Sequence, residues 1–140
     1  MPAKGSAEWK GDLQSGSGTF TAGDTISGDY SFKSRFAGGP GSNPEQLIAA
    51  AHASCFSMAL SNILAAAGTP PESVHTDATV TLRMVDGVPT ITDIALVTVG
   101  RVPGIDAAAF AKHAAEAKTG CPVSRALAGV PEITLEASLA

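Results

Sequence analysis

Two cysteines and a few polar neighbours are the side chains of this sequence best suited to chemistry. Cys55 lies within a long apolar stretch, and Cys121 stands between Gly120 and Pro122, where a helix is predicted to begin. The thiolate is the nucleophilic form of cysteine, so a reactive thiol needs a feature that favours ionisation. Two such thiols can also pair as attacking and resolving groups in a redox cycle.

The surroundings of each cysteine allow a reactive or a structural interpretation. Burial on a helix raises the pKa of Cys55 and leaves it an inert core side chain unless a cation lies nearby. Arg35 is the nearest cation in sequence, although its position is equally typical of an exposed strand residue. Backbone N–H groups at a helix start favour a thiolate at Cys121, which is otherwise a structural residue. Local physics therefore favours Cys121 as the more acidic thiol.

Histidine adds two further alternatives. His52 lies three residues before Cys55 on the same predicted helix and could act as a base for that thiol. His52 could also join Cys55 and Cys121 around zinc, with His113 as an outside candidate. The sequence has no C-x-x-C or H-x-x-x-H pair, which disfavours a metal site. Otherwise His75 and His113 are typical of surface residues.

Composition limits the classes of function. The chain has 140 residues, of which 44% are apolar and 16% charged, so we expect one domain over residues 1–140 with a full core. The formal net charge of −4 gives no basic surface for nucleic acid or anionic lipid. The small charged share predicts that part of the surface is covered, for which an oligomer is one explanation.

The N-terminal segment and the long apolar stretch bear on location. No apolar leader is present, and two cysteines are too few for a disulfide-stapled secreted scaffold, so we expect a cytoplasmic protein. No charged side chain occurs from residue 47 to 67. Interspersed polar residues and the lack of flanking basic residues argue against a membrane span. We expect instead a central helix surrounded by protein on most sides.

The N-terminal third is predicted to contain strands, followed by that helix. Residues 1–36 form short segments between Gly, Ser and Asp turns, and Asp29–Phe36 has the best strand alternation. A loop at residues 38–41 precedes Asn43, a good N-cap, and Pro44, which suits the first helical position. Gly68 ends this helix after about six turns.

The remaining sequence predicts a hairpin, two helices and a last strand. Val74–Val85 and Pro89–Val102 alternate apolar with polar residues around an Asp-Gly turn. Asp106 is the predicted cap of an Ala-rich helix to about residue 118. A short helix follows from Cys121 to Leu127, and Ile133–Leu139 closes the chain as a strand. The fold class is therefore α+β.

Two cysteine motifs carry a family resemblance. The stretch Asn43–Leu60, NPEQLIAAAHASCFSMAL, and the stretch Cys121–Leu127, CPVSRAL, closely resemble the OsmC (osmotically inducible protein C) family. The preceding SRFAGGPGSNPEQL and the order of elements extend the resemblance over nearly the whole chain. It implies antiparallel sheets packed around a long central helix, in an intertwined homodimer with active sites at the subunit interface.

The same resemblance implies a thiol-dependent peroxidase that acts in oxidative or osmotic stress defence. Such enzymes reduce organic hydroperoxides, and less selectively hydrogen peroxide, to alcohol or water without metal, haem or flavin. By resemblance, Cys55 attacks the peroxide and becomes a sulfenic acid, and Cys121 condenses with it to a disulfide. An external dithiol then reduces the disulfide. The family's Arg and Glu partners match Arg35 and Glu45.

The family includes an organic-hydroperoxide-resistance branch, in which the Arg comes from the N-terminal strand region. No Arg precedes Arg35 here, which favours the OsmC branch. Glu45 and Cys55 are ten residues apart, about 15 Å along a straight helix, so direct contact within one subunit is implausible. Either Arg35 spans the gap or the site combines residues of two chains, and the low charge favours the second arrangement.

Two questions stay open at this point. A redox-sensing or binding module could use the same cysteine pair without turnover, which the sequence separates poorly from an enzyme. Phe36, Phe56 and Met58 could line an entrance for hydrophobic hydroperoxides, although core packing is the more ordinary role for each.

Overall fold

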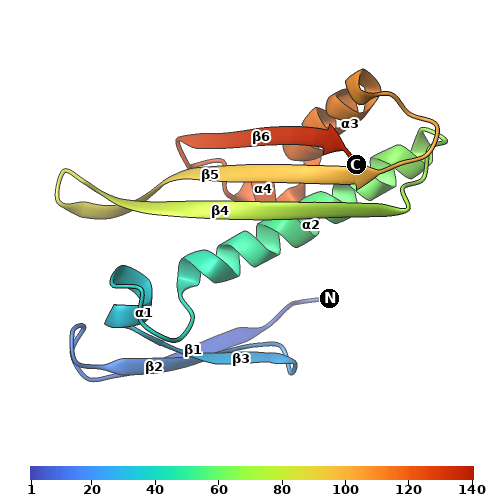
Figure 1. Ribbon diagram of the computed structural model, residues 1–140. Helices are drawn as coiled ribbons and strands as arrows, with labels where there is room; N and C mark the ends of the chain where they lie inside the picture. Colours follow the sequence, from blue (N-terminus) through green and yellow to red (C-terminus); the bar gives the residue numbers. More distant parts are fainter. The chain divides into compact units, whose positions relative to one another are not determined.

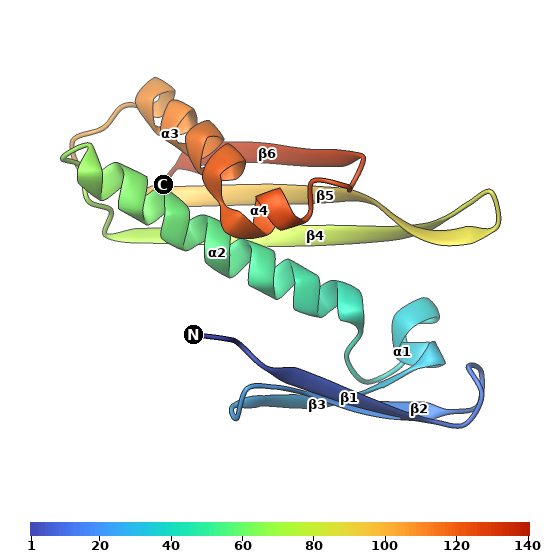
Figure 2. The same ribbon diagram turned by 180° about the vertical axis from the view of Figure 1, so that it is seen from behind.

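The computed structural model describes residues 1–140, which divide into two compact units, Met1–Leu47 and Ile48–Ala140. We refer to them as the N-terminal unit and the C-terminal unit and describe each by itself. Figures 1 and 2 label their elements. The expectation of one domain over residues 1–140 stays a prediction.

The N-terminal unit is built on a three-stranded antiparallel sheet. Its strands β1 (Gly5–Lys10), β2 (Ser17–Ala22) and β3 (Ile26–Ser31) follow one another in space as in sequence. Trp9 and Tyr30 both pair with Gly18, so their rings lie on one face, with centroids 5.3 Å apart. Because Gly18 has no side chain, the Tyr30 ring can lie directly over β2.

The strand predicted at Asp29–Phe36 is wrong in its second half. The chain leaves β3 after Ser31 and forms the short helix α1 (Phe32–Phe36). Ser31 and Ser34 make a capping box, in which each hydroxyl accepts from the other residue's backbone N–H. This reciprocal cap satisfies donors that the helix start would otherwise leave unpaired, and it outweighs the strand-like alternation.

The long helix α2 (Pro44–Ala66) begins and ends where the sequence predicts. The Asn43 side chain accepts a hydrogen bond from the backbone N–H of Gln46 at 2.8 Å, and Pro44 occupies the first helical position. Gly68 adopts φ 85°, a left-handed conformation that suits glycine after a helix.

The sheet of the C-terminal unit is mixed. The strands β4 (Ser73–Val85) and β5 (Val88–Arg101) form the predicted hairpin around Asp86 and Gly87, both with positive φ. The last strand β6 (Glu132–Leu139) pairs with β5 in the parallel direction. The antiparallel arrangement implied by the resemblance therefore holds for the hairpin and not for this last pairing.

Within the C-terminal unit, the helices lie on one face of this sheet, as Figures 1 and 2 show together. They are α2, α3 (Ala107–Gly120) and α4 (Pro122–Ala126). Asp106 caps α3 as predicted, because its carboxylate accepts from the N–H of Ala109. Every fourth residue of one α2 face is buried, namely His52, Phe56, Leu60 and Leu64. This face forms a core with Ile94 and Leu96 of β5 and with Phe110 and Ala114 of α3.

The opposite side of α2 stays exposed in a single chain. Its exposed positions include Ala51, Ser54, Asn62 and Met58, whose side chain is 75% exposed. One sheet can cover only one face of a helix, so the expectation of protein on most sides is not met within one chain. The helix α2 is long and apolar enough to cross a membrane. Core helices of soluble proteins meet the same criterion of length and composition, so this finding is weak evidence for a membrane span.

Candidate active site

The two cysteines meet inside the C-terminal unit. Cys55 is half-buried on α2, and Cys121 is fully buried at the turn between α3 and α4; both are free thiols. Cys55 packs against the buried cluster that contains Cys121, and each thiol shifts the pKa of the other, so the two lie close together although 66 positions separate them in the numbered sequence. The structure therefore brings the predicted attacking and resolving groups together.

The two thiols differ in acidity. Burial and the neighbouring Cys121 thiol raise the pKa of Cys55, and the opposing effect of the Val123 N–H does not offset them. Burial also opposes ionisation of Cys121, but contacts from the Ser124 N–H and hydroxyl, the Cys55 thiol and the Val123 N–H outweigh it and lower the pKa of Cys121. These shifts run in the direction expected from the position of Cys121 at a helix start.

A buried histidine lies behind Cys121. The ring Nε2 of His52 and the hydroxyl oxygen of Ser124 are 2.7 Å apart, and His52 is fully buried. Burial lowers the pKa of His52, which favours the neutral imidazole. The sequence suggested His52 as a base for Cys55, but its Nε2 is engaged with Ser124. Ser124 was not predicted from the sequence, since no local pattern signals a contact between α2 and α4.

The N-terminal unit holds the other predicted pair, Arg35 and Glu45. Arg35 Nη2 donates to Glu45 Oε1 at 2.7 Å, and Arg35 Nε lies 3.2 and 3.3 Å from the two carboxylate oxygens. The Arg35 side chain is 35% exposed and that of Glu45 10%. This two-point geometry fixes the plane of the guanidinium, as a single contact to a lysine would not.

Short-range contacts place these two residues side by side. The Ser34 hydroxyl on α1 donates to the carbonyl of Ser42 at 2.7 Å, and the Asn43 amide donates to the carbonyl of Ser34 at 3.3 Å. The N–H of Ser42 donates to Asp29 on β3 at 2.8 Å. These bonds close the glycine-rich loop, so that α1 presents Arg35 to Glu45 in the first turn of α2.

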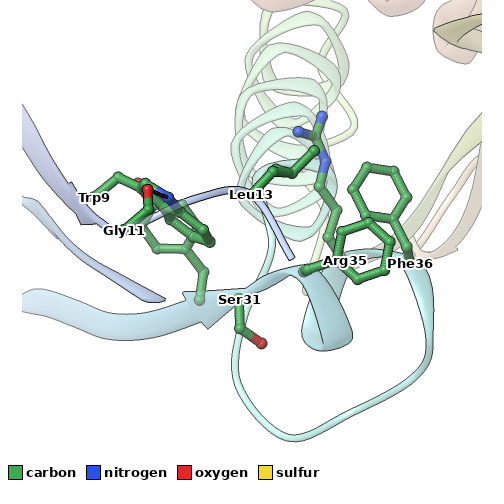
Figure 3. Close-up of a pocket in the computed structure, with 8 residues that line it drawn as sticks. Trp9, Gly11, Leu13, Ser31, Arg35 and Phe36 are labelled. Carbon is green, nitrogen blue, oxygen red and sulfur yellow. Dashed lines mark hydrogen bonds between the residues drawn. The ribbon is translucent and has the colours of Figure 1, made fainter. Parts of the chain in front are cut away.

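An open pocket of about 420 Å³ adjoins Arg35 in the N-terminal unit. Figure 3 shows the Arg35 guanidinium directed between Leu13 and the Phe36 ring. The guanidinium carbon is 5.3 Å from the Phe36 ring centroid, a cation–π geometry. The wall is mostly apolar and is formed by Trp9, Gly11, Leu13, Tyr30, Ser31, Phe32, Arg35 and Phe36.

Only one of the three apolar side chains considered for a substrate entrance lies at this pocket. Phe36 lines it, Phe56 is fully buried in the core of the C-terminal unit, and Met58 lies on the exposed face of α2. Trp9 and Tyr30 were not among the site residues predicted from the sequence. The strand alternation that places both rings on one face was their signal.

Residues 1–140 contain no group of three or more His, Cys, Asp or Glu side chains arranged to hold a metal ion. His113, the outside candidate for a zinc site, lies on α3 with its Nδ1 3.3 Å from Glu116. His75 is paired with Asp77 on β4 at 3.3 Å, and its side chain is exposed, as expected from the sequence.

Comparison with known proteins agrees with this fold. The family model described as OsmC-like protein matches residues 37–136. The chain is 49% identical over 138 residues to Peroxiredoxin OsmC of Escherichia coli (strain K12), covering 97% of this chain and 95% of the relative. The same figures apply to Peroxiredoxin OsmC of Shigella flexneri.

Solved structures give the same fold. The organic hydroperoxide resistance protein OhrB of Bacillus subtilis superposes with a TM-score of 0.75 at 26% identity, covering 100% of this chain and 98% of that one. An OsmC-like protein of Vibrio cholerae superposes with a TM-score of 0.77 at 18% identity, covering 98% and 99%. The fold is thus shared with OsmC-like and organic-hydroperoxide-resistance proteins. The chain belongs to the OsmC family.

Proposed function

We propose that this protein reduces organic hydroperoxides, and less selectively hydrogen peroxide, through a Cys55 sulfenic acid and a Cys55–Cys121 disulfide. The predicted class, a thiol-dependent peroxidase, is confirmed by near full-length similarity to relatives named Peroxiredoxin OsmC. A peroxidase of this class needs a hydroperoxide substrate and a thiol reductant.

The proximity of two free thiols, one half-buried and one fully buried, is the observation that carries the proposal. Cys55 is half-buried, so peroxide can reach it, whereas Cys121 is fully buried beside it. A half-buried thiol next to a buried one suits a cycle in which the accessible thiol is oxidised and the buried thiol resolves it.

The first step transfers one oxygen. The Cys55 thiolate attacks a peroxide oxygen, so that an S–O bond forms, the O–O bond breaks and the alkoxide leaves to be protonated as the alcohol. In the second step the Cys121 sulfur attacks the Cys55 sulfur, an S–S bond forms and the hydroxide leaves as water. An external dithiol returns both thiols by supplying two electrons and two protons.

Cys55 requires a cation to serve as the attacking thiolate, because its surroundings in the C-terminal unit raise its pKa. We assign this role to Arg35, whose guanidinium also polarises the O–O bond as charge develops on the leaving oxygen. Glu45 fixes the orientation of Arg35 through their two-point pair. Arg35 and Glu45 act on Cys55 of the same or of the other subunit.

The apolar pocket beside Arg35 supports organic hydroperoxides as the preferred substrates. Its aromatic wall suits an alkyl or aryl substituent, whereas the guanidinium suits the polar peroxide end. Hydrogen peroxide has no substituent to fill the pocket, so it gains no apolar contact there.

A second copy of this chain is the proposed cover for the exposed side of α2. That side is uncharged and rich in small side chains, and it leaves Met58 mostly in solvent in a single chain. Burial of this surface in a homodimer accounts for the low charged share of the sequence. A cytoplasmic location, where dithiol reductants are available, also belongs to this proposal.

Steady-state reduction of cumene hydroperoxide and of hydrogen peroxide, each with a dithiol or a monothiol, tests this function. We expect repeated turnover that is faster with cumene hydroperoxide and with the dithiol, and no turnover in Cys55→Ser. A single stoichiometric oxidation without turnover would favour a redox sensor, and retained turnover in Cys55→Ser would contradict the proposal.

A further inference from the structure

The pair formed by His52 and Ser124 lies behind Cys121 and has no part in the cycle described so far. His52 is on α2 and Ser124 on α4, and both are buried. Their side chains make a hydrogen bond of 2.7 Å across 72 residues of sequence. The other ring nitrogen of His52, Nδ1, is buried without a partner. Buried polar groups with incomplete hydrogen bonding are rare, and such a group calls for an explanation.

Ser124 connects this histidine to the thiol. Ser124 is the third residue of α4, whose N-cap is Cys121, and its N–H and hydroxyl both help to lower the pKa of Cys121. The Cys121 backbone is held on each side, since its N–H donates to Ala117 at 2.8 Å and its carbonyl accepts from Arg125 at 3.0 Å. The sulfur therefore sits in a fixed position with Ser124 as a polar neighbour and His52 behind that neighbour.

The positions of the protons on His52 and Ser124 determine which group donates to which. The Ser124 hydroxyl has one proton, so it donates either to His52 or to Cys121. A neutral histidine with its proton on Nδ1 would bury an unpaired N–H, which is rarer than a buried acceptor without a donor. The proton is therefore better placed on Nε2, where it is donated to the Ser124 oxygen and leaves the hydroxyl proton for the sulfur.

We propose that His52 and Ser124 are positioning residues for the resolving step: His52 Nε2–H donates to Ser124 Oγ, and the Ser124 hydroxyl donates to the Cys121 sulfur. This inference rests on the function proposed above, and it assigns a role to residues that take no part in peroxide attack. In this arrangement the pair stabilises the thiolate of Cys121 beside Cys55.

The resolving step then balances without an external base. As the Cys121 sulfur bonds to the Cys55 sulfur, the S–O bond of the sulfenic acid breaks and hydroxide leaves. Cys121 has already lost its proton to solvent on ionising, so the hydroxide takes a proton from solvent to become water, and the net reaction is thiol plus sulfenic acid to disulfide plus water. Because burial lowers the pKa of His52, an imidazolium is unfavourable, so His52 acts as a neutral donor rather than as a base.

Single-turnover oxidation separates this step from peroxide attack. Reduced protein is mixed with one equivalent of cumene hydroperoxide, quenched in acid and resolved by intact-protein mass spectrometry into thiol, sulfenic acid and disulfide. In Ser124→Ala and His52→Leu we expect sulfenic acid to form at the normal rate and to accumulate. Disulfide formation should be at least about tenfold slower, since a hydrogen bond to a charged group is lost.

His52→Gln tests whether the histidine is a donor or a base. The glutamine amide N–H can replace the Nε2–H, so disulfide formation should stay within about threefold of the normal rate. The double variant His52→Leu/Ser124→Ala should be no slower than Ser124→Ala, because His52 acts through Ser124. Equal slowing in His52→Gln and His52→Leu would overturn the donor role.

Ser57→Ala and His113→Gln are matched controls. Ser57 also donates from α2 to a hydroxyl, that of Thr76 at 2.8 Å, and His113 is a second paired histidine of the C-terminal unit. Both should form the disulfide at the normal rate. Normal disulfide formation in Ser124→Ala would overturn the inference, and this variant decides the matter even if His52→Leu fails to fold. Failure of the unaltered protein to form a Cys55 sulfenic acid would instead overturn the proposed function.

Discussion

Replacing Glu45 by glutamine is the sharpest perturbation of the Arg35 geometry. The substitution keeps the size of the side chain and one carbonyl acceptor but removes the negative charge that accepts from Arg35 Nε and Nη2. Arg35 remains beside Phe36 and the pocket, but its guanidinium plane is no longer fixed from two sides. We therefore expect a loss in the step that uses Arg35, not a loss of fold.

The size of this loss follows from the burial of the pair. A hydrogen bond to a charged group contributes about 1.5–3 kcal/mol. Arg35 is 35% exposed, so solvent screening reduces this contribution, although Glu45 is 10% exposed. We expect about 1–2 kcal/mol, which is a fall of about 5- to 30-fold in the rate constant for Cys55 sulfenic acid formation.

The assay is single-turnover oxidation by cumene hydroperoxide, followed as sulfenic acid and disulfide. Glu45→Gln and Arg35→Lys should both slow sulfenic acid formation, since lysine keeps the charge but not the two-point pairing. The control is Glu8→Gln, which removes the exposed partner of Lys10 in the same unit and should react normally. Unchanged sulfenic acid formation in Glu45→Gln, or slowing confined to disulfide formation, would refute the positioning role of Glu45.

Three further outcomes concern stability. Leu60→Ala, in the core of the C-terminal unit, should lower the free energy of unfolding by about 2–5 kcal/mol in chemical denaturation, whereas Met58→Ala on the exposed side of α2 should change it by less than about 0.5 kcal/mol in the monomer. Asp106→Ala should cost about 1 kcal/mol in the same assay by removing the cap bond to Ala109. Burial holds the pKa of His52 below its ordinary value of 6.5, so the unfolded state binds that proton first as pH falls. The stability it contributes is complete above pH 6.5 and declines below it, and His52→Gln should lack this decline in denaturation curves recorded across that range.

The sequence predicted those elements that carry local signals. Asn43 and Pro44 mark the start of α2, and Asp86-Gly87 marks the hairpin turn, because capping and turn chemistry act over a few residues. The five-residue helix α1 was missed, since a Ser31–Ser34 capping box is a weak signal inside an alternating stretch. The parallel pairing of β6 depends on how the chain returns to β5, which no local pattern encodes.

In the candidate site, too, features with a local signal could be predicted from the sequence, whereas contacts between distant residues could not. The acidity of Cys121 could be inferred from its position at a helix start, and the pairing of Arg35 with Glu45 came from the family resemblance. The contact of His52 with Ser124 joins residues 72 positions apart and required the structure. The roles of the two thiols still rest on resemblance, because the more acidic one is the one assigned to resolve rather than to attack.

Identification of the cysteine that peroxide oxidises first tests this assignment most directly. Cys55→Ser and Cys121→Ser are each treated with one equivalent of cumene hydroperoxide, and the sulfenic acid is trapped with a 1,3-diketone and located by peptide mass spectrometry. The account predicts a trapped sulfenic acid at Cys55 in Cys121→Ser and none at Cys121 in Cys55→Ser. Rapid trapping at Cys121 in Cys55→Ser would contradict it and would make the buried, acidic thiol the nucleophile.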